Sequence, residues 1–162
     1  MLFRSVDNRE SFANRERFPD AGEIFAEEYE EVFPKLTVHE STYLIIVTRG
    51  HRDDMRVLRW AVGTQARYIA MIGSKRKTIS VIHELEREGF PREAFERIFA
   101  PMGLEIGAES PEEIAISVVA EMIAVRRSPQ ADWRALSKSI FAHDRLKALL
   151  KSPPPVAEVA GD

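Results

Sequence analysis

The sequence predicts an α/β protein in three layers, with a parallel sheet between two layers of helices. Two short β-branched runs, Tyr43–Val47 and Tyr68–Ile72, have the composition of buried strands. Each run ends in a polar turn that contains a glycine, and each turn opens a helical pattern. This order of strand, turn and helix, found twice, is typical of parallel sheets. Such sheets bind ligands at the carboxyl ends of their strands, where we expect the two turns to lie side by side.

Composition excludes several classes of function. The 162 residues suffice for one domain with a hydrophobic core, and the net charge of −3 gives no overall basic field for nucleic acid. The absence of cysteine excludes disulfides, thiolate metal sites and a cysteine nucleophile. No apolar run approaches the ~20 residues of a membrane span, and no signal-peptide pattern is present. We therefore expect a soluble, cytoplasmic protein with no nucleic-acid or membrane partner.

The first part of the chain predicts two short strands and a helix. Val6–Arg9 has the pattern of a strand that ends in an acid, and Glu23–Ala26 that of a short edge strand. Glu27–Val32 is predicted to be a brief acidic helix that stops near Pro34. In dinucleotide-binding folds, an acid ends the second strand about 20 residues after a glycine-rich loop. The sequence contains no G-x-G-x-x-G or Walker A pattern.

The two central strands are each followed by a helix. Tyr43–Val47 is predicted to be buried on both faces, and the helix after it ends at Gly63. Apolar residues recur in that helix at helical spacing: Met55, Leu58 and Val62. Ser74 is a plausible N-cap for a second helix that runs through Glu88. Its predicted buried stripe consists of Ile79, Ile82 and Leu85.

The last third predicts a short strand, a loop and two helices. Pro91 opens a small helix around Phe95, and Ile98–Ala100 is expected to be the last strand. Ser110 begins a capping box for a helix whose segment Ile114–Val125 is apolar nearly all round, which predicts deep packing against the sheet or a partner. Beyond a domain covering residues 1–128, we expect a helical extension over 129–151 and a disordered tail over 152–162. The extension is predicted from four apolar residues: Trp133, Leu136, Ile140 and Leu150.

The turn Gly73–Lys77 has the stronger case for a ligand. A glycine allows close approach of a backbone, a helix N-terminus offers unpaired N–H groups, and three cations add charge. These features suit an anion, most simply a phosphate. The alternative is a solvated basic first turn capped by Ser74, but cations at this end of a helix oppose its dipole.

The other candidates are ambiguous from the residues alone. His51, in the turn Thr48–His51, can serve a ligand or exchange protons, and it can equally cap its own helix. Asp54 can simply complement the helix dipole. The loop Pro101–Gly107 can face a ligand or be a tight connection, and no histidine has acids at metal-ligand spacing. The pair Glu112 and Glu113 is interpreted as a helix start.

Four segments in order resemble the XdhC/CoxI family, which comprises accessory proteins of xanthine dehydrogenase and related molybdenum hydroxylases. They are Val6–Arg9, Thr48–Asp54, Tyr68–Lys77 and Ala100–Val125. The resemblance covers the C-terminal Rossmann-type domain of the family, about residues 6–127 here.

The resemblance implies a chaperone without turnover of its own. Family members are expected to bind the pterin-based molybdenum cofactor, to protect it during sulfuration by a sulfurtransferase, and to help insert it into the apo-hydroxylase. The cofactor carries a phosphate, or a nucleotide in some forms, which suits the turn after Ile72. By matched motif, the residues expected to line the site are Asp7, Arg9, Thr48, Arg49, Gly50, His51, Asp54, Gly73, Ser74, Lys75, Arg76, Pro101, Gly103 and Gly107.

The chain departs from the family pattern at its start. A full member has an upstream domain and a first Rossmann strand with a glycine-rich turn, so the chain is expected to be an N-terminally truncated member. A natural short protein remains the alternative. In the strand order 3-2-1-4-5-6 the first strand is central. We therefore expect unpaired backbone beside Val6 and Tyr43, and a chain that is unstable alone or fills the gap from another chain, for example as a homo-oligomer. Ala70 replaces the usual glycine of the third segment.

Two alternative functions remain open from the sequence. One is an NAD(P)-dependent oxidoreductase domain in which Asp7 holds a ribose, although the phosphate loop and a catalytic acid–base pair are missing. The other is a structural or regulatory module whose turns have lost their ligand.

Overall fold

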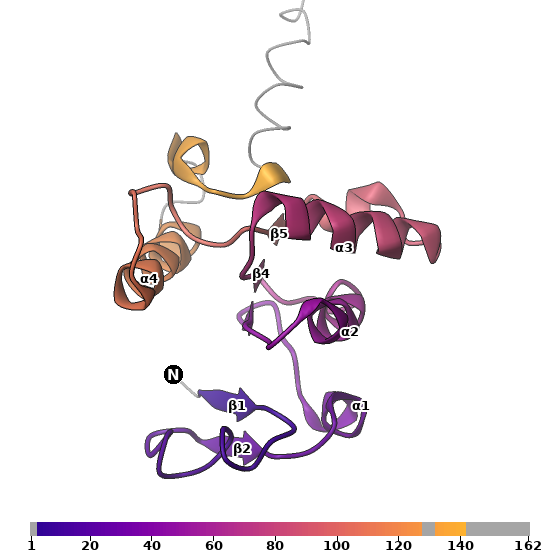
Figure 1. The fold of residues 1–162 in the computed structure, drawn as a ribbon, viewed down its shortest axis with the longest axis vertical. Helices are drawn as coiled ribbons and strands as arrows, with labels where there is room; N and C mark the ends of the chain where they lie inside the picture. The colour runs from indigo at the N-terminus through magenta and orange to yellow at the C-terminus, as the bar shows by residue number, and fades with distance from the viewer. Residues whose placement is uncertain (1–2, 128–131, 142–162) are drawn as a thin grey trace, which may run out of the picture.

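The computed structural model describes residues 3–127 and 132–141. Its five strands form two parallel sheets, ordered β1–β2 and β3–β4–β5 (Figure 1). The strands are β1 (Arg4–Val6), β2 (Glu23–Phe25), β3 (Tyr43–Ile46), β4 (Tyr68–Met71) and β5 (Ile98–Phe99). The predicted α/β class with parallel strands is confirmed.

Four α-helices and three 3₁₀ turns connect and cover the strands within the described residues. The helices are α1 (Tyr29–Val32), α2 (His51–Ala61), α3 (Lys75–Arg87) and α4 (Pro111–Arg127). The 3₁₀ turns are η1 (Phe33–Lys35), η2 (Arg92–Phe95) and η3 (Asp132–Leu136). No helix in the described part of the chain is long and apolar enough to cross a membrane.

Two apolar clusters occupy the two faces of the β3–β4–β5 sheet. The larger one joins Ile46, Ile69 and Met71 to the inner sides of α2 and α3. The smaller one packs Tyr68 and Ala70 against α4 on the other face. The two clusters use alternate residues of β4, which is why all four residues of that strand are buried.

The prediction for β3 was wrong in one respect. This strand is not buried on both faces, because Ile45 is 44% exposed and Val47, just beyond its end, is 60% exposed. The physical reason is that β3 pairs only with β4 among the described strands, so its other edge has no neighbour. The expected break beside Val6 and Tyr43 is therefore present, as the division into two sheets shows.

Helix α3 begins as predicted, but its buried stripe is shifted. The Ser74 hydroxyl accepts a hydrogen bond from the Lys77 backbone N–H at 3.2 Å, which caps the helix. Ile79 is 43% exposed and does not belong to the stripe. The buried residues are Thr78, Val81, Ile82 and Leu85. Their spacing of three and four residues satisfies the helical period as well as the predicted set does.

Helix α4 starts with the predicted capping box. The Ser110 hydroxyl accepts from the Glu113 N–H at 3.3 Å, and the Glu113 carboxylate accepts from the Ser110 N–H at 3.0 Å. Deep packing is confirmed on one side only, since Ile116, Val119 and Ile123 are exposed.

The predicted helical extension over 129–151 is described only at residues 132–141, so as a whole it stays a prediction. Residues 132–136 form η3, and Ser137 then makes an antiparallel bridge to Leu104. The Ser139 hydroxyl donates to the Ile98 carbonyl at 3.1 Å. These bonds hold the short stretch 137–139 against β5 and the loop of Leu104, between η3 and the helical residues Ile140 and Phe141. Leu150 and the tail over 152–162 lie outside the described residues.

Candidate functional site

The turns after β3, β4 and β5 meet at one end of the sheet. Ile46 is paired with Met71 in the parallel register, and the Ile72 N–H donates to the Ile46 carbonyl at 3.0 Å. The Met102 N–H donates to the Met71 carbonyl at 3.1 Å. Thus the segments predicted to carry a ligand, Thr48–His51, Gly73–Arg76 and Pro101–Gly107, follow neighbouring strand ends. The arrangement agrees with the common location of ligands in parallel sheets.

A buried ion pair fastens the first two turns together. The Asp54 side chain is fully buried, and its Oδ1 accepts from the Thr48 hydroxyl at 2.6 Å. Its Oδ2 pairs with the Lys77 ammonium from the first turn of α3. Asp54 therefore links the loop before α2 to the start of α3 from a fully buried position.

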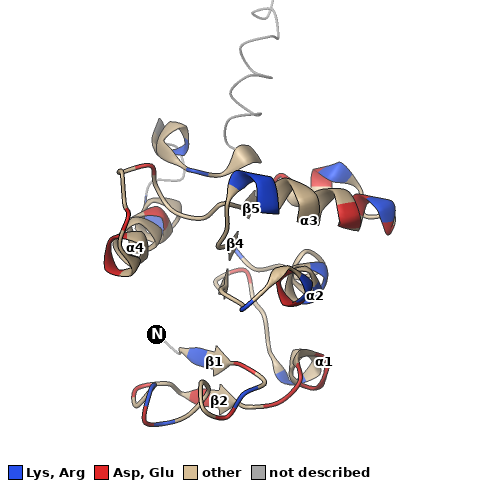
Figure 2. Ribbon diagram, viewed as in Figure 1, with Lys and Arg blue, Asp and Glu red and all other residues tan. Residues whose placement is uncertain are grey.

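The start of α3 retains cations that the protein does not neutralise. Of the three basic residues in this turn, Lys77 pairs with Asp54, whereas Lys75 and Arg76 are exposed and have no ion-pair partner among the described residues. Figure 2 shows this basic segment at the end of α3 nearest β5. Gly73 has a φ of 156°, and a Cβ there would lie 3.1 Å from the Lys77 Cδ. The glycine thus leaves room for the Lys77 stem to pass toward Asp54.

Some polar groups of the turn after β3 already have hydrogen-bond partners in the turn or in α2. The Arg49 Nε donates to Asp53 Oδ2 at 3.3 Å, and Gly50 is the extended N-cap residue of α2. His51 is the first residue of α2 and its side chain is exposed. His51 and the exposed Arg49 side chain therefore remain accessible at the end of the sheet where the turns after β3, β4 and β5 meet, here called the rim. Thr48 instead points inward to Asp54.

Asp7 and Arg9, just after β1, bind each other. The Arg9 guanidinium donates to both carboxylate oxygens of Asp7 at 2.9 Å, and the Arg9 N–H donates to Oδ1 at 3.0 Å. These hydrogen bonds lower the pKa of Asp7, and the positive charge of Arg49 lowers it further. The Arg9 guanidinium also lies over the Phe12 ring, 3.7 Å from its centroid. Asp7 is thus ionised, and both of its carboxylate oxygens already accept hydrogen bonds from Arg9.

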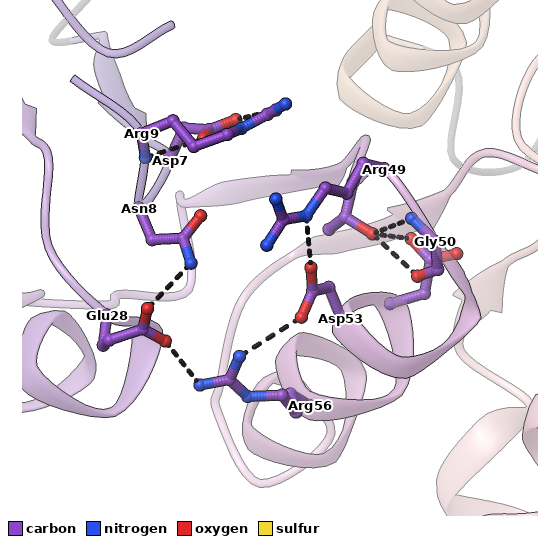
Figure 3. A network of polar contacts seen from close by, with 10 residues as sticks. Asp7, Asn8, Arg9, Glu28, Arg49, Gly50, Asp53 and Arg56 are labelled. Atoms are coloured by element: carbon purple, nitrogen blue, oxygen red, sulfur yellow. Dashed lines mark hydrogen bonds and ion pairs between the residues drawn. The ribbon is translucent and has the colours of Figure 1, made fainter. Parts of the chain in front are cut away.

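A polar network that the sequence did not predict joins the two sheets at this rim (Figure 3). The Asn8 side chain donates to Glu28 at 2.8 Å, and Arg56 donates to Glu28 at 2.9 Å and to Asp53 at 3.2 Å. Asp53 in turn binds Arg49. The network connects the end of β1 to α2, so it holds Asp7 and Arg49 near each other. Arginines and acids 26 to 28 residues apart give no local signal of pairing in a sequence.

Aromatic stacking also joins η1 to α2. The rings of Phe33 in η1 and Trp60 in α2 are stacked, with centroids 4.5 Å apart and an interplanar angle of 2°. Together with the contacts of Arg56, this stack fixes α1 and η1 against α2.

The third segment predicted to carry a ligand, Pro101–Gly107, is largely a connection that packs against α4. Pro101 and Gly103 are buried, and Gly103 has a φ of 98°. A Cβ at Gly103 would lie 2.4 Å from the Ser117 hydroxyl oxygen, so glycine allows the loop to approach α4. Gly107 is exposed, with a φ of 72°. Of the three site residues predicted in this loop, Gly107 is the one that solvent reaches.

Glu121 of α4 organises this loop and was missed by the sequence analysis. Its fully buried carboxylate accepts from the Tyr68 hydroxyl at 2.5 Å, the Ser137 hydroxyl at 2.5 Å and the Gly103 N–H at 2.9 Å. Burial and the nearby Glu121 charge raise the pKa of Tyr68, which keeps that hydroxyl a donor. In the sequence, the available signal for this role was a single acid, Glu121, within the apolar segment Ile114–Val125.

No group of three or more histidine or acid side chains in residues 3–127 and 132–141 is placed to hold a metal ion. The accessible polar groups at the rim are instead the exposed cations Arg49, Lys75 and Arg76, together with His51. Cations at a helix start suit a negatively charged ligand, since they would otherwise oppose the dipole of α3.

Comparison with known proteins supports the resemblance seen in the sequence. "Uncharacterized protein YqeB" of Escherichia coli K12 is 31% identical over 121 residues, which cover 74% of this chain and 22% of that protein. A protein of Bacillus subtilis 168, named as a probable xanthine dehydrogenase subunit, is 28% identical over 122 residues, covering 75% of this chain and 35% of that protein. The chain thus spans about a third or less of the length of these curated relatives.

A solved structure agrees in fold as well as in sequence. The crystal structure of a xanthine dehydrogenase from Bacillus halodurans superposes with a TM-score of 0.66 and 29% sequence identity, over 78% of this chain and 37% of that chain. The family model of the XdhC Rossmann domain matches residues 3–122. On this match, and with the parallel sheet and the rim described above, the chain belongs to the XdhC Rossmann domain family.

Proposed function

We propose that this chain is an accessory protein of a xanthine dehydrogenase-type molybdenum hydroxylase. In this role it binds the molybdenum cofactor as cargo, through the cofactor's phosphate, while a sulfurtransferase acts on it and before it enters the apo-hydroxylase. The names of the B. subtilis relative and the B. halodurans structure, together with family membership, support the link to xanthine dehydrogenase. The chain itself performs no turnover in this proposal.

The observation that carries the proposal is the pair of free cations at the start of α3. The Asp54–Lys77 ion pair consumes one positive charge and fixes the turn, while Lys75 and Arg76 remain available beside the β3 turn. A phosphate at this position would satisfy these charges and the helix dipole together. Arg49 and His51 lie at the neighbouring strand end and supply further donors for polar groups of the cargo.

The alternative of an NAD(P)-binding oxidoreductase is less well supported. In dinucleotide-binding domains, the acid after the second strand accepts hydrogen bonds from a ribose. Here both oxygens of Asp7 already accept from Arg9. A nicotinamide cofactor would have to displace this bidentate pair.

The test compares cofactor retention by three forms of the 162-residue chain, each coproduced with the cofactor biosynthetic enzymes. The parent, a Lys75→Ala/Arg76→Ala variant and an Arg87→Ala control are purified alike. Bound cofactor is measured as molybdenum by mass spectrometry and as oxidised pterin by fluorescence. Arg87 is a matched control because it is an exposed cation at the other end of α3.

We expect the double variant to retain about tenfold less cofactor than the parent, because each lost charge-assisted contact costs about 1.5–3 kcal/mol before solvent screening. The control should match the parent. Equal retention by the double variant would refute the phosphate assignment. Absence of both molybdenum and pterin from the parent, with stoichiometric NAD(P)H binding instead, would favour the oxidoreductase.

A further inference from the structure

We infer that the segment 132–141, here called the strap, controls the conformation of the loop Pro101–Gly107, and that strap and loop detach from the sheet as one unit. While the strap is in place, the backbone of the loop is bound to the protein itself. Detachment of the strap makes that backbone available to a ligand at the rim. The strap is drawn in yellow beside β5 in Figure 1. This inference concerns the conformation of the free chain, so it does not depend on the proposed cofactor.

The strap covers the edge of β5 that does not pair with β4. The Ser139 hydroxyl donates to the Ile98 carbonyl at 3.1 Å and accepts from the Ala100 N–H at 3.3 Å. The Ile140 N–H donates to the Ala100 carbonyl at 3.0 Å. The strap therefore binds backbone groups that an edge strand would otherwise leave unpaired.

Beyond β5, the strap pairs with the loop in the antiparallel direction. The Lys138 N–H donates to the Gly103 carbonyl at 2.9 Å, and the Glu105 N–H donates to the Leu136 carbonyl at 2.6 Å. Backbone groups that are taken from water need such partners. The loop therefore cannot change its backbone conformation without losing its bonds to the strap.

The remaining N–H groups of the loop also have partners. Those of Met102, Gly103 and Leu104 donate to acceptors on β4 and α4 at 2.9 to 3.2 Å. The Ile106 N–H donates to the Leu104 carbonyl at 3.0 Å. Every N–H group from Met102 to Ile106 thus has a protein partner, and in this conformation the loop offers none of them to a ligand.

The Glu121 carboxylate couples the strap to the loop. Its Oε2 accepts from the Gly103 N–H at 2.9 Å, and its Oε1 accepts from the Ser137 hydroxyl at 2.5 Å. The side chain has no solvent exposure. Removal of either donor leaves a buried carboxylate oxygen short of a partner, which is unfavourable. Loop and strap are therefore expected to leave Glu121 together, as water reaches it.

Aromatic side chains fix the strap on both faces of the sheet. Trp133 stacks on Phe99 of β5, with ring centroids 6.0 Å apart, and Phe99 belongs to the smaller cluster on the α4 face. Phe141 is buried in the larger cluster, which α2 and α3 cover. The strap thus crosses the edge of the sheet and contributes to the core on each side. An element held in this way opens cooperatively rather than by fraying.

The test is backbone hydrogen exchange of the 162-residue chain, measured by NMR. We expect the amides of Gly103, Glu105, Lys138 and Ile140 to have equal protection, within about threefold, because one opening exposes all of them. The amides of β4 should be at least about tenfold more protected, because the sheet stays paired when the strap detaches.

Ser137→Ala removes one donor to Glu121 and leaves the backbone pairing in place. It should speed exchange of the loop and strap amides together, by at least about tenfold. Thr78→Ala is the matched control, because it removes another fully buried hydroxyl, on α3. Since α3 stays folded when the strap detaches, the control should leave exchange of these amides within about twofold of the parent.

A reversible crosslink gives an independent measurement. The pair Glu105→Cys and Leu136→Cys places thiols on opposite, exposed residues of loop and strap, in a chain that has no cysteine. Opposite residues of an antiparallel pair have Cα atoms about 4.5–5.5 Å apart, which a disulfide can span. Exchange at Gly103 and Ile140 should be at least about tenfold slower in the oxidised than in the reduced form.

Several results would overturn the inference. One is a difference of more than about tenfold between the protection of loop and strap amides, and another is protection of both equal to that of β4. Faster exchange of the strap alone in Ser137→Ala would show that the loop holds its conformation without it. Unchanged exchange at Gly103 and Ile140 in the oxidised crosslinked form would contradict the coupling in the same way.

Discussion

Replacing Lys77 by methionine tests whether one ion pair holds the rim together. The substitution keeps the apolar stem that passes Gly73 but removes the ammonium that pairs with Asp54. The Asp54 side chain has no solvent exposure, and with Lys77 gone its carboxylate keeps one described side-chain partner, the Thr48 hydroxyl. The variant therefore leaves a buried, uncompensated negative charge.

The magnitude follows from this burial. Breaking a buried ion pair by removing one partner costs about 3–5 kcal/mol. The Lys77 side chain is 28% exposed, so solvent screens part of the interaction and the lower limit, about 3 kcal/mol, applies. Asp54→Asn removes the buried charge and keeps an oxygen for Thr48, so it should cost only about 1–2 kcal/mol. The double variant should cost no more than Asp54→Asn alone, which gives a coupling of at least about 3 kcal/mol.

The assay is equilibrium urea unfolding followed by the fluorescence of Trp60 and Trp133, with the same concentration of trimethylamine oxide in all samples to raise the starting stability. For an m-value of about 2 kcal/mol/M, Lys77→Met should lower the midpoint by about 1.5 M. Lys75→Met is the matched control, because Lys75 is exposed and has no ion-pair partner among the described residues, and its midpoint should stay near that of the parent. A midpoint for Lys77→Met within about 0.3 M of the parent, or strict additivity in the double variant, would refute the reasoning.

Three further outcomes are expected from the same structure. Glu121→Gln should lower the free energy of unfolding by about 2–3 kcal/mol, measured by urea titration. The buried carboxylate accepts three hydrogen bonds, whereas the NH₂ group of an amide would face donors that it cannot accept from. Gly103→Ala should cost at least about 2 kcal/mol by the same assay, because its φ is positive and its Cβ would lie 2.4 Å from a hydroxyl oxygen; a neutral result would contradict the close approach. The pKa values of Glu28 and Glu30 are held below their ordinary value of 4.5, Glu28 by Asn8 first and then by Arg56, Glu30 by Arg56. Their contribution to stability is therefore present above that value and is lost as the pH falls through the lower folded-state pKa values. Arg56→Gln should reduce the loss of the free energy of unfolding at acid pH. An unchanged dependence of that free energy on pH would count against the network.

Local patterns in the sequence were sufficient for most elements. The capping box at Ser110 and the N-cap at Ser74 were predicted because each needs only residues within one turn of helix. The β-branched runs predicted β3 and β4, and their shared direction predicted that the two turns would be neighbours. The four family-like segments predicted membership in the family, which the match over residues 3–122 confirms.

Properties that depend on pairing between distant residues were not predictable in this way. The shift of the α3 stripe from Ile79 to Thr78 depends on how the helix is rotated against the sheet, and both sets obey the same period. The non-helical stretch 137–139 within the predicted extension was not predictable, because Ser137 and Ser139 bind groups on α4 and β5, far away in sequence.

The sequence by itself determined the class of fold, the order of its strands and the positions of the turns, because hydrophobic periodicity and capping are local. The tertiary structure alone decided which charges remain free for a ligand. It pairs Asp54 with Lys77 and Asp7 with Arg9, and it leaves Lys75 and Arg76 exposed at the rim. It also decided that one edge of β3 has no described neighbouring strand and that Ile116, Val119 and Ile123 of α4 are exposed. The physical reason is that Coulomb interactions and burial depend on distances in space, which neither composition nor spacing along the chain specifies.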